Sequence, residues 1–313
     1  MSETLTSQGN RADRCRNCGK NDLQDLGPIG KVAPFFLKRA LGLELRNPTS
    51  PNPLKQMIRR IASIPISLFP RLSSQFAFVE MQICSNCSFI QTKRPFRDDD
   101  IMRLYADYRS SSYNLERIRF EPDYASIAAR VGYDEVEVRN RTGALATFLR
   151  RNLGSGQTRT ILDYGGADGR FIPEIPGRRF VFEVSDVDPI PGVTRIDSEA
   201  DLGRYAIVLL AHVIEHVPHP LDLVQKVASY VEPEGFLYIE TPQEIADGER
   251  DGLRRGSLCL DVGIHEHINS YCVPAVERLL DTAGFEVIAV ESSPVDVGWA
   301  KAIHIRALGR KRS

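Results

Sequence analysis

Four of the six cysteines in this 313-residue chain lie in two CxxC pairs, Cys15 with Cys18 and Cys84 with Cys87. Two thiolates separated by two residues can bind one ion from a tight turn, and two such pairs complete the tetrahedral sulfur shell that Zn²⁺ prefers. Because four thiolates leave no open coordination position, we expect this ion to support folding rather than catalysis. The first residues are polar and show no secretory h-region, so disulfides are the weaker interpretation of the pairs.

A glycine-rich turn is the second feature that can do chemistry. It reads DYGGADG from Asp163 to Gly169, at the end of the β-rich run TILDYG. A turn of this kind brings backbone N–H groups close to a ligand, although a tight turn without a ligand is an alternative. The acid Asp163 would repel a pyrophosphate and attract a cationic amino group. We predict a helix directly after the turn, over the sequence RFIPEI.

Five of the six histidines follow two later β-rich runs, YAIVLLAH and GFLYIET: His212, His216, His219, His265 and His267. Ligands of α/β proteins bind at the carboxyl ends of the strands, so this clustering favours a role in proton transfer. A neutral imidazole can remove a proton from an acceptor, and Glu215 or Glu266 can orient it. The alternative is structural, with His212 and His265 bonded to buried backbone groups and His219 in solvent.

These residues need a scaffold, and residues 156–313 alternate short β-rich runs with stretches of helical length. This order predicts an α/β fold with a mostly parallel sheet that helices cover on both faces. Residues 98–155 repeat apolar positions every three or four residues, which predicts a helical connector that caps the acceptor pocket. Residues 1–97 hold both CxxC pairs, and we expect them to form a zinc-binding module.

The two CxxC pairs are separated by 65 residues, more than a small zinc-binding module needs. Within this stretch, residues 28–75 form a proline-rich insertion with eight basic side chains and one acid. Its charge and its apolar runs, PFFLKRALGLEL and MIRRIASIPISLF, suggest peripheral contact with an anionic membrane surface or a lipid-linked acceptor. The favoured alternative is an insertion that simply packs on its own domain.

The composition of the whole chain is that of an ordinary soluble protein, with 26% charged and 42% hydrophobic residues. Forty basic and 41 acidic side chains leave a net charge of −1, which gives no support for nucleic acid as an obligatory partner. No apolar stretch approaches the ~18–20 residues of a membrane span, and we expect a cytoplasmic protein. Cys259 and Cys272 stand alone, and we expect both to be buried apolar side chains.

The glycine turn and the strands around it resemble the class I S-adenosylmethionine-dependent methyltransferases, in which a D-x-G-x-G-x-G turn holds the amino acid end of the cofactor. In this chain Ala167 replaces the middle glycine. The resemblance implies a Rossmann-like, seven-stranded domain over residues 156–313 and S-adenosylmethionine as the cofactor. Glu183 would hold the ribose, with Asp186 as a rival, and Asp197 would contact adenine. The cofactor-binding set is Asp163, Gly165, Gly166, Ala167, Gly169, Glu183, Asp197 and His212.

The order of CxxC, CxxC, YADYRSSSY, glycine turn, HVIEHVPHP and HEHINSY is similar to the zinc-containing methyltransferases that act on nucleotide-linked sugars and related glycan precursors. This resemblance implies that a loop histidine, a Glu-His pair and tyrosines ahead of the Rossmann-like domain surround the acceptor. One position departs from the pattern, because Ile264 stands where a tyrosine is expected. The matching candidate catalytic residues are His216, Glu266, His267, Tyr108 and Tyr113.

Together these features predict methyl transfer from S-adenosylmethionine to a small-molecule acceptor, a nucleotide-linked sugar or a glycan- or lipid-linked precursor. The main alternative is an RNA or protein methyltransferase that uses the zinc module to grip a macromolecule. A non-catalytic binding protein and a nicotinamide dehydrogenase are further alternatives. The nearly complete cofactor motif disfavours the former, and Asp163 beside the turn disfavours the latter.

Overall fold

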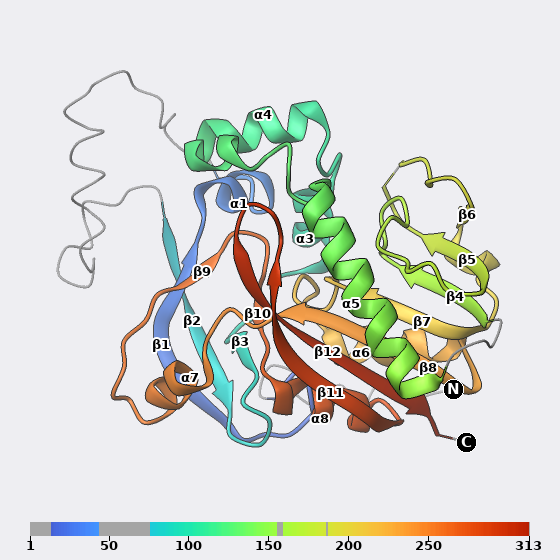
Figure 1. Cartoon of the computed structure of the whole chain (residues 1–313). Helices are drawn as coiled ribbons and strands as arrows, with labels where there is room; N and C mark the ends of the chain where they lie inside the picture. The colour runs from blue at the N-terminus through green and yellow to red at the C-terminus, as the bar shows by residue number, and fades with distance from the viewer. Residues whose placement is uncertain (1–13, 44–75, 155–158, 186, 313) are drawn as a thin grey trace, which may run out of the picture.

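A computed structural model describes residues 14–43, 76–154, 159–185 and 187–312 of the chain. Two sheets organise these residues (Figure 1). The larger sheet has seven strands, in the order β11-β12-β8-β7-β4-β5-β6. Its strands are β4 (Arg159–Tyr164), β5 (Gly177–Phe182), β6 (Val193–Ile196), β7 (Tyr205–Ala211), β8 (Val231–Pro242), β11 (Phe285–Asp296) and β12 (Lys301–Lys311).

The larger sheet is mixed. Strands β4 to β8 pair in parallel, whereas β12 runs antiparallel to both β8 and β11. The chain passes outward from β4 to β5 and β6, then returns to place β7 on the other side of β4. In open α/β sheets, ligands bind outside the carboxyl ends of the strands where the order reverses in this way. The fold therefore directs a ligand to the ends of β4 and β7.

Both faces of the larger sheet are buried, because successive side chains of a strand point to opposite faces. Ile161 of β4 packs with Phe148 of α5 (Glu135–Leu153), which crosses the near face in Figure 1. The next residue, Leu162, belongs to a second cluster that includes Val224 of α6 (Pro220–Val227) and Val276 of α8 (Val273–Thr282). A helical layer on each face explains the apolar β-rich runs of the sequence.

The helix predicted after the glycine turn is absent. Residues 165–176 form turns and bends with no helix before β5 begins. Pro173 and Pro176 account for the difference, because each lacks a backbone N–H and disfavours helical geometry in the residue before it. The other short helices of the domain are η4 (Glu199–Asp201), η5 (Ala228–Tyr230) and α7 (Asp247–Arg254).

The smaller sheet combines segments that lie far apart in the sequence. It has the order β10-β3-β2-β1-β9, and its strands are β1 (Leu23–Val32), β2 (Ala77–Cys84), β3 (Ile90–Thr92), β9 (Val262–Ile264) and β10 (Asn269–Ser270). Strand β9 pairs in parallel with β1, and β10 pairs antiparallel with β3. The sheet that carries the CxxC pairs thus extends beyond residue 97, because residues 262–270 complete both of its edges.

Helices fill the segment between the two sheets, where the sequence predicts a helical connector. They are α3 (Asp98–Tyr105), α4 (Ser111–Phe120), η3 (Pro122–Ser126) and α5. The side chain of Ser110 caps α4 by accepting the N–H of Tyr113, and Asp134 caps α5 by accepting the N–H of Val136. In Figure 1, α4 lies across the top of the molecule and α5 leads from it to the larger sheet.

Part of the basic insertion is core. Residues 44–75 of the predicted 28–75 insertion lie outside the described residues, but residues 28–43 form the end of β1 and helix α1 (Pro34–Arg39). Phe35 and Phe36 are fully buried, and the Phe35 ring meets Tyr113 of α4 edge-on at 5.0 Å. The PFFL run therefore packs beneath the cap and is not available for contact with a membrane surface, in line with the favoured interpretation of a packed insertion. None of the helices in the described part of the chain has the length and hydropathy to span a bilayer.

Candidate functional site

The glycine turn follows β4 and is tightly constrained. Gly165 and Ala167 have φ values of +79° and +50°, a region that costs an L-residue roughly 1–2 kcal/mol. Gly166 has no room for a side chain, because a Cβ there would lie 2.3 Å from the carboxyl group of Asp163. The backbone of the turn therefore folds directly over Asp163. The alanine in place of the middle glycine is accommodated, but in a strained conformation.

Asp163 is a buried carboxyl group with an unused oxygen. Asp163 is 1% exposed, and its Oδ1 has no hydrogen-bond partner among the described residues. Burial raises the pKa of Asp163 to about 7, and although Arg141 opposes this shift, Glu183 adds to it. An unpaired buried carboxyl oxygen is costly unless a cation or donor reaches it. The site therefore fits a ligand with an ammonium group, as the cofactor has.

The other predicted cofactor-binding residues differ in their contacts and in their exposure to solvent. The Glu183 carboxylate accepts the backbone N–H groups of Ala167 and Ser185, each at 3.0 Å, so it holds the glycine turn against the loop after β5. Asp197 projects into solvent, with a side chain that is 86% exposed and 3.1 Å from Arg195. Asp186, the rival to Glu183, lies outside the described residues.

His212 lies at the end of β7, between two buried carboxylates. Its Nδ1 is 3.2 Å from Glu215, and its Nε2 is 3.4 Å from Glu240. Burial would raise the pKa of Glu240, but Arg141 and the neighbouring histidines hold it well below its ordinary value. The groups around the Glu240 carboxylate are Arg141, Tyr238, His304, Arg306 and His212. This ionic network behind the glycine turn is not apparent from the sequence, because its members come from α5, β7, β8 and β12.

Three tyrosines of the cap meet the two histidine loops. Tyr108 and Tyr113 donate to the two oxygens of Glu266, at 3.2 and 2.9 Å, and Arg117 pairs with the same carboxylate. Burial would raise the pKa of Glu266, but Arg117 keeps it below its ordinary value. Glu266 is thus an ionised anchor between the cap and its loop. We refer to the group as the Tyr–His–Glu cluster: Tyr105, Tyr108, Tyr113, His216, Glu266 and His267.

His216 contacts Tyr105, a residue that was not among the predicted site residues. The hydroxyl group of Tyr105 lies 2.6 Å from His216 Nδ1, and the His216 and His267 rings are 4.7 Å apart. Tyr105 ends α3, three residues before Tyr108, so the YADY spacing itself was the available signal. Burial lowers the pKa of His216 to about 4. Burial also opposes charge on His267, but Glu244, 2.7 Å from Nδ1, raises its pKa to about 9.

His265 stays outside the Tyr–His–Glu cluster. Its side chain is 56% exposed and its Nδ1 lies 3.1 Å from Glu121, so the predicted bond to buried backbone does not form. Strand β9 ends at Ile264 and the chain bends at residues 265 and 266, where His265 pairs with Glu121 instead of joining the cluster. This exposed imidazole provides a matched control for experiments on its two neighbours.

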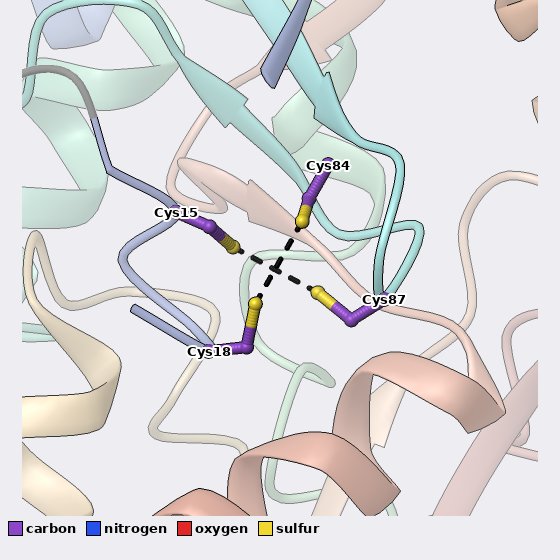
Figure 2. Close-up of side chains that lie close together, drawn as sticks. All are labelled: Cys15, Cys18, Cys84 and Cys87. Atoms are coloured by element: carbon purple, nitrogen blue, oxygen red, sulfur yellow. Dashed lines mark hydrogen bonds between the residues drawn. The ribbon is translucent and has the colours of Figure 1, made fainter. Parts of the chain in front are cut away.

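The four CxxC sulfur atoms converge on one point, as Figure 2 shows. Cys15 and Cys87 sulfurs are 3.7 Å apart, and so are those of Cys18 and Cys84. All four residues are buried. Tetrahedral zinc with Zn–S bonds of ~2.3 Å would separate its sulfurs by ~3.8 Å. The arrangement therefore has the dimensions of a tetrathiolate metal site.

The surroundings of the sulfurs tie this site to the larger domain. Asn17 directs its side-chain N–H₂ to Cys87 Sγ at 3.6 Å and to the carbonyl of Ala275 in α8 at 2.8 Å. Cys272, buried as predicted, donates its thiol to the carbonyl of Cys87. Cys259 is exposed, contrary to prediction, because it lies in the loop between α7 and β9.

Residues 138–290 match the family model described as a methyltransferase domain. No curated protein matches the sequence significantly. Similar solved structures include the 1,6-didemethyltoxoflavin-N1-methyltransferase of Burkholderia thailandensis, with bound 1,6-didemethyltoxoflavin and S-adenosylhomocysteine. It is 18% identical, with 61% of this chain and 87% of that chain covered and a TM-score of 0.42. An S-adenosylmethionine-dependent methyltransferase from Mesorhizobium loti is 15% identical, with coverages of 56% and 100% and a TM-score of 0.39.

The matched residues contain the glycine turn, strands β4 to β8 and both histidine loops. The mixed sheet is the Rossmann-like α/β fold predicted from the sequence. The protein is therefore an S-adenosylmethionine-dependent methyltransferase, with its methyltransferase domain over residues 138–290.

Proposed function

We propose that the protein transfers a methyl group from S-adenosylmethionine to a small-molecule acceptor that binds between the helical cap and the carboxyl ends of β4 and β7. The observation that supports this most is the contact of cap tyrosines with both histidine loops, through Tyr105 to His216 and Tyr113 to Glu266. A group of hydroxyl, imidazole and carboxylate side chains of this kind suits a compact acceptor with hydroxyl groups.

The cofactor residues we propose are those of the glycine turn and the loops beside it. Asp163 would receive the ammonium group, for which its unpaired Oδ1 is suited. Glu183 would hold the ribose and Asp197 the adenine, each after a side-chain adjustment from its present contacts. His212 would orient Glu240 and Glu215 beneath the cofactor. The remaining proposed members of the set are Gly165, Gly166, Ala167 and Gly169.

The proposed base is His216. When bound, S-adenosylmethionine supplies an electrophilic methyl group on a positively charged sulfur. His216 would accept the proton of the acceptor hydroxyl, amine or acidic C–H group, and the electron pair freed on the acceptor would take up the methyl group, with S-adenosylhomocysteine as the other product. Glu215 Oε1, 3.9 Å from His216 Nε2, stabilises the imidazolium. Tyr105 orients the ring.

The other members of the Tyr–His–Glu cluster have supporting roles in this proposal. Glu266 accepts hydrogen bonds from Tyr108 and Tyr113 and so fixes the wall of the acceptor pocket. His267, paired with Glu244, contributes a positive charge that suits an acceptor with an anionic group. A nucleotide-linked sugar or a glycan- or lipid-linked precursor combines the hydroxyl groups and the phosphates that this pocket would recognise.

We propose a structural Zn²⁺ ion on Cys15, Cys18, Cys84 and Cys87. The sulfur separations support it, and so do the side-chain amides of Asn17 and Asn86, which donate toward Cys87 and Cys18. We also propose that residues 1–97, 98–155 and 156–313 act as zinc module, cap and catalytic domain. Metal analysis should find about one Zn²⁺ per chain at this site, and Cys84→Ser should lower the melting temperature. Full stability of a metal-free protein would contradict the assignment.

Calorimetry tests the cofactor part of the proposal. S-adenosylmethionine and S-adenosylhomocysteine should each bind at one site per chain, whereas NAD should not. A panel of nucleotide-linked sugars, scored by formation of S-adenosylhomocysteine, then tests the acceptor class. Binding of NAD alone would overturn the cofactor assignment. Turnover only with RNA or protein substrates would overturn the small-molecule assignment.

A further inference from the structure

Three side chains, including the proposed base, converge on a common point outside the Cys cluster. Glu215, His216 and His267 each offer one ligand atom, and these atoms all lie within 4.8 Å of one another. His216 Nε2 and Glu215 Oε1 are 3.9 Å apart. We propose that these three residues form a second metal site, which binds one divalent transition-metal ion.

The rings are already held as metal-binding histidines usually are. His216 Nδ1 lies 2.6 Å from the Tyr105 hydroxyl and 3.3 Å from the backbone carbonyl of Glu266, and His267 Nδ1 lies 2.7 Å from the Glu244 carboxylate. In known metal sites the ring nitrogen that does not bind the ion is commonly held by a carboxylate or a carbonyl group. The Nε2 atom of each ring therefore remains for an ion, which on His267 would displace the proton of the charged imidazole.

Glu215 supplies the negative charge. It is 1% exposed, and Thr241 donates to its Oε2 at 3.1 Å. Within the part of the chain that the structure describes, Glu215 Oε1 has no hydrogen-bond partner, although His212 Nδ1 lies 3.2 Å away. A buried carboxylate with an unused oxygen is expensive unless a cation compensates it. Glu244 and Glu266 add negative charge nearby, so the surroundings favour a cation.

The donor set indicates the class of ion. Two imidazoles and one carboxylate suit Zn²⁺, Co²⁺ or Ni²⁺, whereas Mg²⁺ and Ca²⁺ prefer oxygen ligands. Tetrahedral ligation with bonds of ~2.1 Å would place the ligand atoms ~3.4 Å apart. The present separations must therefore shorten on binding, and His267, whose side chain is 28% exposed, has room to move.

An ion at this place would change the chemistry of the proposed base. It would occupy His216 Nε2 and separate the ring from Glu215, so the metal-bound form should transfer protons poorly. This consequence rests on the proposed function. The metal site itself rests only on the three converging side chains and the groups that hold them.

Cobalt titration of the purified full-length chain tests the site, with Co²⁺ as the probe and without cofactor or acceptor. Thiolate ligation gives an intense sulfur-to-cobalt absorption band, whereas His and Glu ligands give only weaker visible bands. Whether the Cys cluster keeps its Zn²⁺ or exchanges it for Co²⁺, we expect a second metal equivalent: about one further Co²⁺ per chain that adds no thiolate band. His267→Ala and His267→Gln should each lose the second equivalent, and the matched control His265→Ala should keep it. Glu244→Gln should weaken its affinity by about 10- to 100-fold.

Retention of the second equivalent in both His267 variants and in His216→Ala would overturn the proposal. Saturation of the wild-type chain by the thiolate-bound ion alone would overturn it as well. Because the titration needs neither S-adenosylmethionine nor an acceptor, failure of the proposed methyl transfer leaves this result interpretable. Circular dichroism of each variant shows whether it has folded.

Discussion

The glycine turn and the Tyr–His–Glu cluster lie at the same edge of the larger sheet but are built in different ways. The turn is one continuous segment, from Asp163 to Gly169, whose conformation is dictated by φ values and by close packing. The cluster takes residues from α3, α4, the loop after β7 and the loop before β10. A change in the turn should therefore act on cofactor binding alone. A change in the cluster should act on the acceptor and on proton transfer.

The two regions also treat buried charge differently. Asp163 has an unpaired oxygen and a raised pKa, which is the state of a site that awaits a cation. Glu266 is saturated by two tyrosines and Arg117, which is the state of a structural anchor. Burial alone thus does not identify the group that meets a ligand. The unused hydrogen-bonding capacity does.

Loss of the proposed base should have the largest effect. His216→Ala should lower kcat by roughly 100- to 10,000-fold, because that is the usual contribution of a general base, and should leave the Kd for S-adenosylmethionine unchanged. Single-turnover kinetics with a confirmed acceptor measures the rate, and calorimetry measures the affinity. His265→Ala is the matched control and should behave like the wild type. A nearly wild-type rate for His216→Ala would remove this residue as the base.

Distorting the glycine turn should weaken the binding of S-adenosylmethionine, in contrast to His216→Ala, which should lower kcat. Gly165 has a φ of +79°, and a Cβ there would lie 3.0 Å from Val213, so Gly165→Val forces a β-branched residue into strained backbone. Strain of roughly 1–3 kcal/mol corresponds to an affinity loss of about 5- to 150-fold for S-adenosylmethionine. The metal content of the Cys cluster should not change. Equal losses of cofactor and metal would show that the two regions are not independent.

Cofactor affinity should rise with pH through the titration of Asp163. The carboxyl group has a pKa of about 7 in the folded protein, where burial and the neighbouring acids Glu183, Glu240 and Asp168 outweigh Arg141. An ammonium ligand needs the ionised form, so affinity should increase about tenfold between pH 6 and pH 8. Calorimetry at a series of pH values measures this. The Asp163→Asn variant should bind S-adenosylmethionine more weakly, and its affinity should no longer depend on pH in this range. An unchanged pH dependence in the variant would show that another group titrates.

The smallest expected effects are those of removing the hydroxyl groups of Tyr105 and Tyr113, which we expect to have different roles. Tyr105→Phe removes the hydroxyl group 2.6 Å from His216 and should lower kcat by roughly 2- to 10-fold, since one hydrogen bond contributes about 0.5–1.5 kcal/mol. Tyr113→Phe loosens Glu266 instead, so its effect should fall mainly on the KM of the acceptor. Steady-state kinetics of both variants distinguishes the two roles. Identical changes in kcat and KM for the two variants would show that Tyr105 and Tyr113 have the same role.

Local patterns of the sequence predicted the larger sheet well. Each of six β-rich runs falls on a strand of the larger sheet: TILDYG, RFVFEVS, YAIVLLAH, GFLYIET, FEVIAVES and KAIHIRAL. The first four lie in the parallel part of the sheet, where strands buried on both faces are continuously apolar. The helix predicted after Gly169 does not form, because Pro173 and Pro176 disfavour it even where a strand and a turn precede it. The Cys cluster was predictable as well, since CxxC spacing is a local geometric property.

Long-range partners were not predictable from one sequence. Strands β9 and β10 join the smaller sheet across more than 170 residues, and two or three residues carry too little pattern to reveal this. The same holds for Glu240, whose partners Arg141 and His304 come from other elements. Tyr105 differs from these residues, because its three-residue spacing from Tyr108 in YADY is a local pattern of the sequence.

A crystal structure of the complex with S-adenosylmethionine tests the central claim most directly. We expect the ammonium group of the cofactor at Asp163, its adenosine toward the loops after β5 and β6, and its methyl group facing His216 and Tyr105. A methyl group that points away from the Tyr–His–Glu cluster, or a cofactor bound away from the glycine turn, would contradict the account.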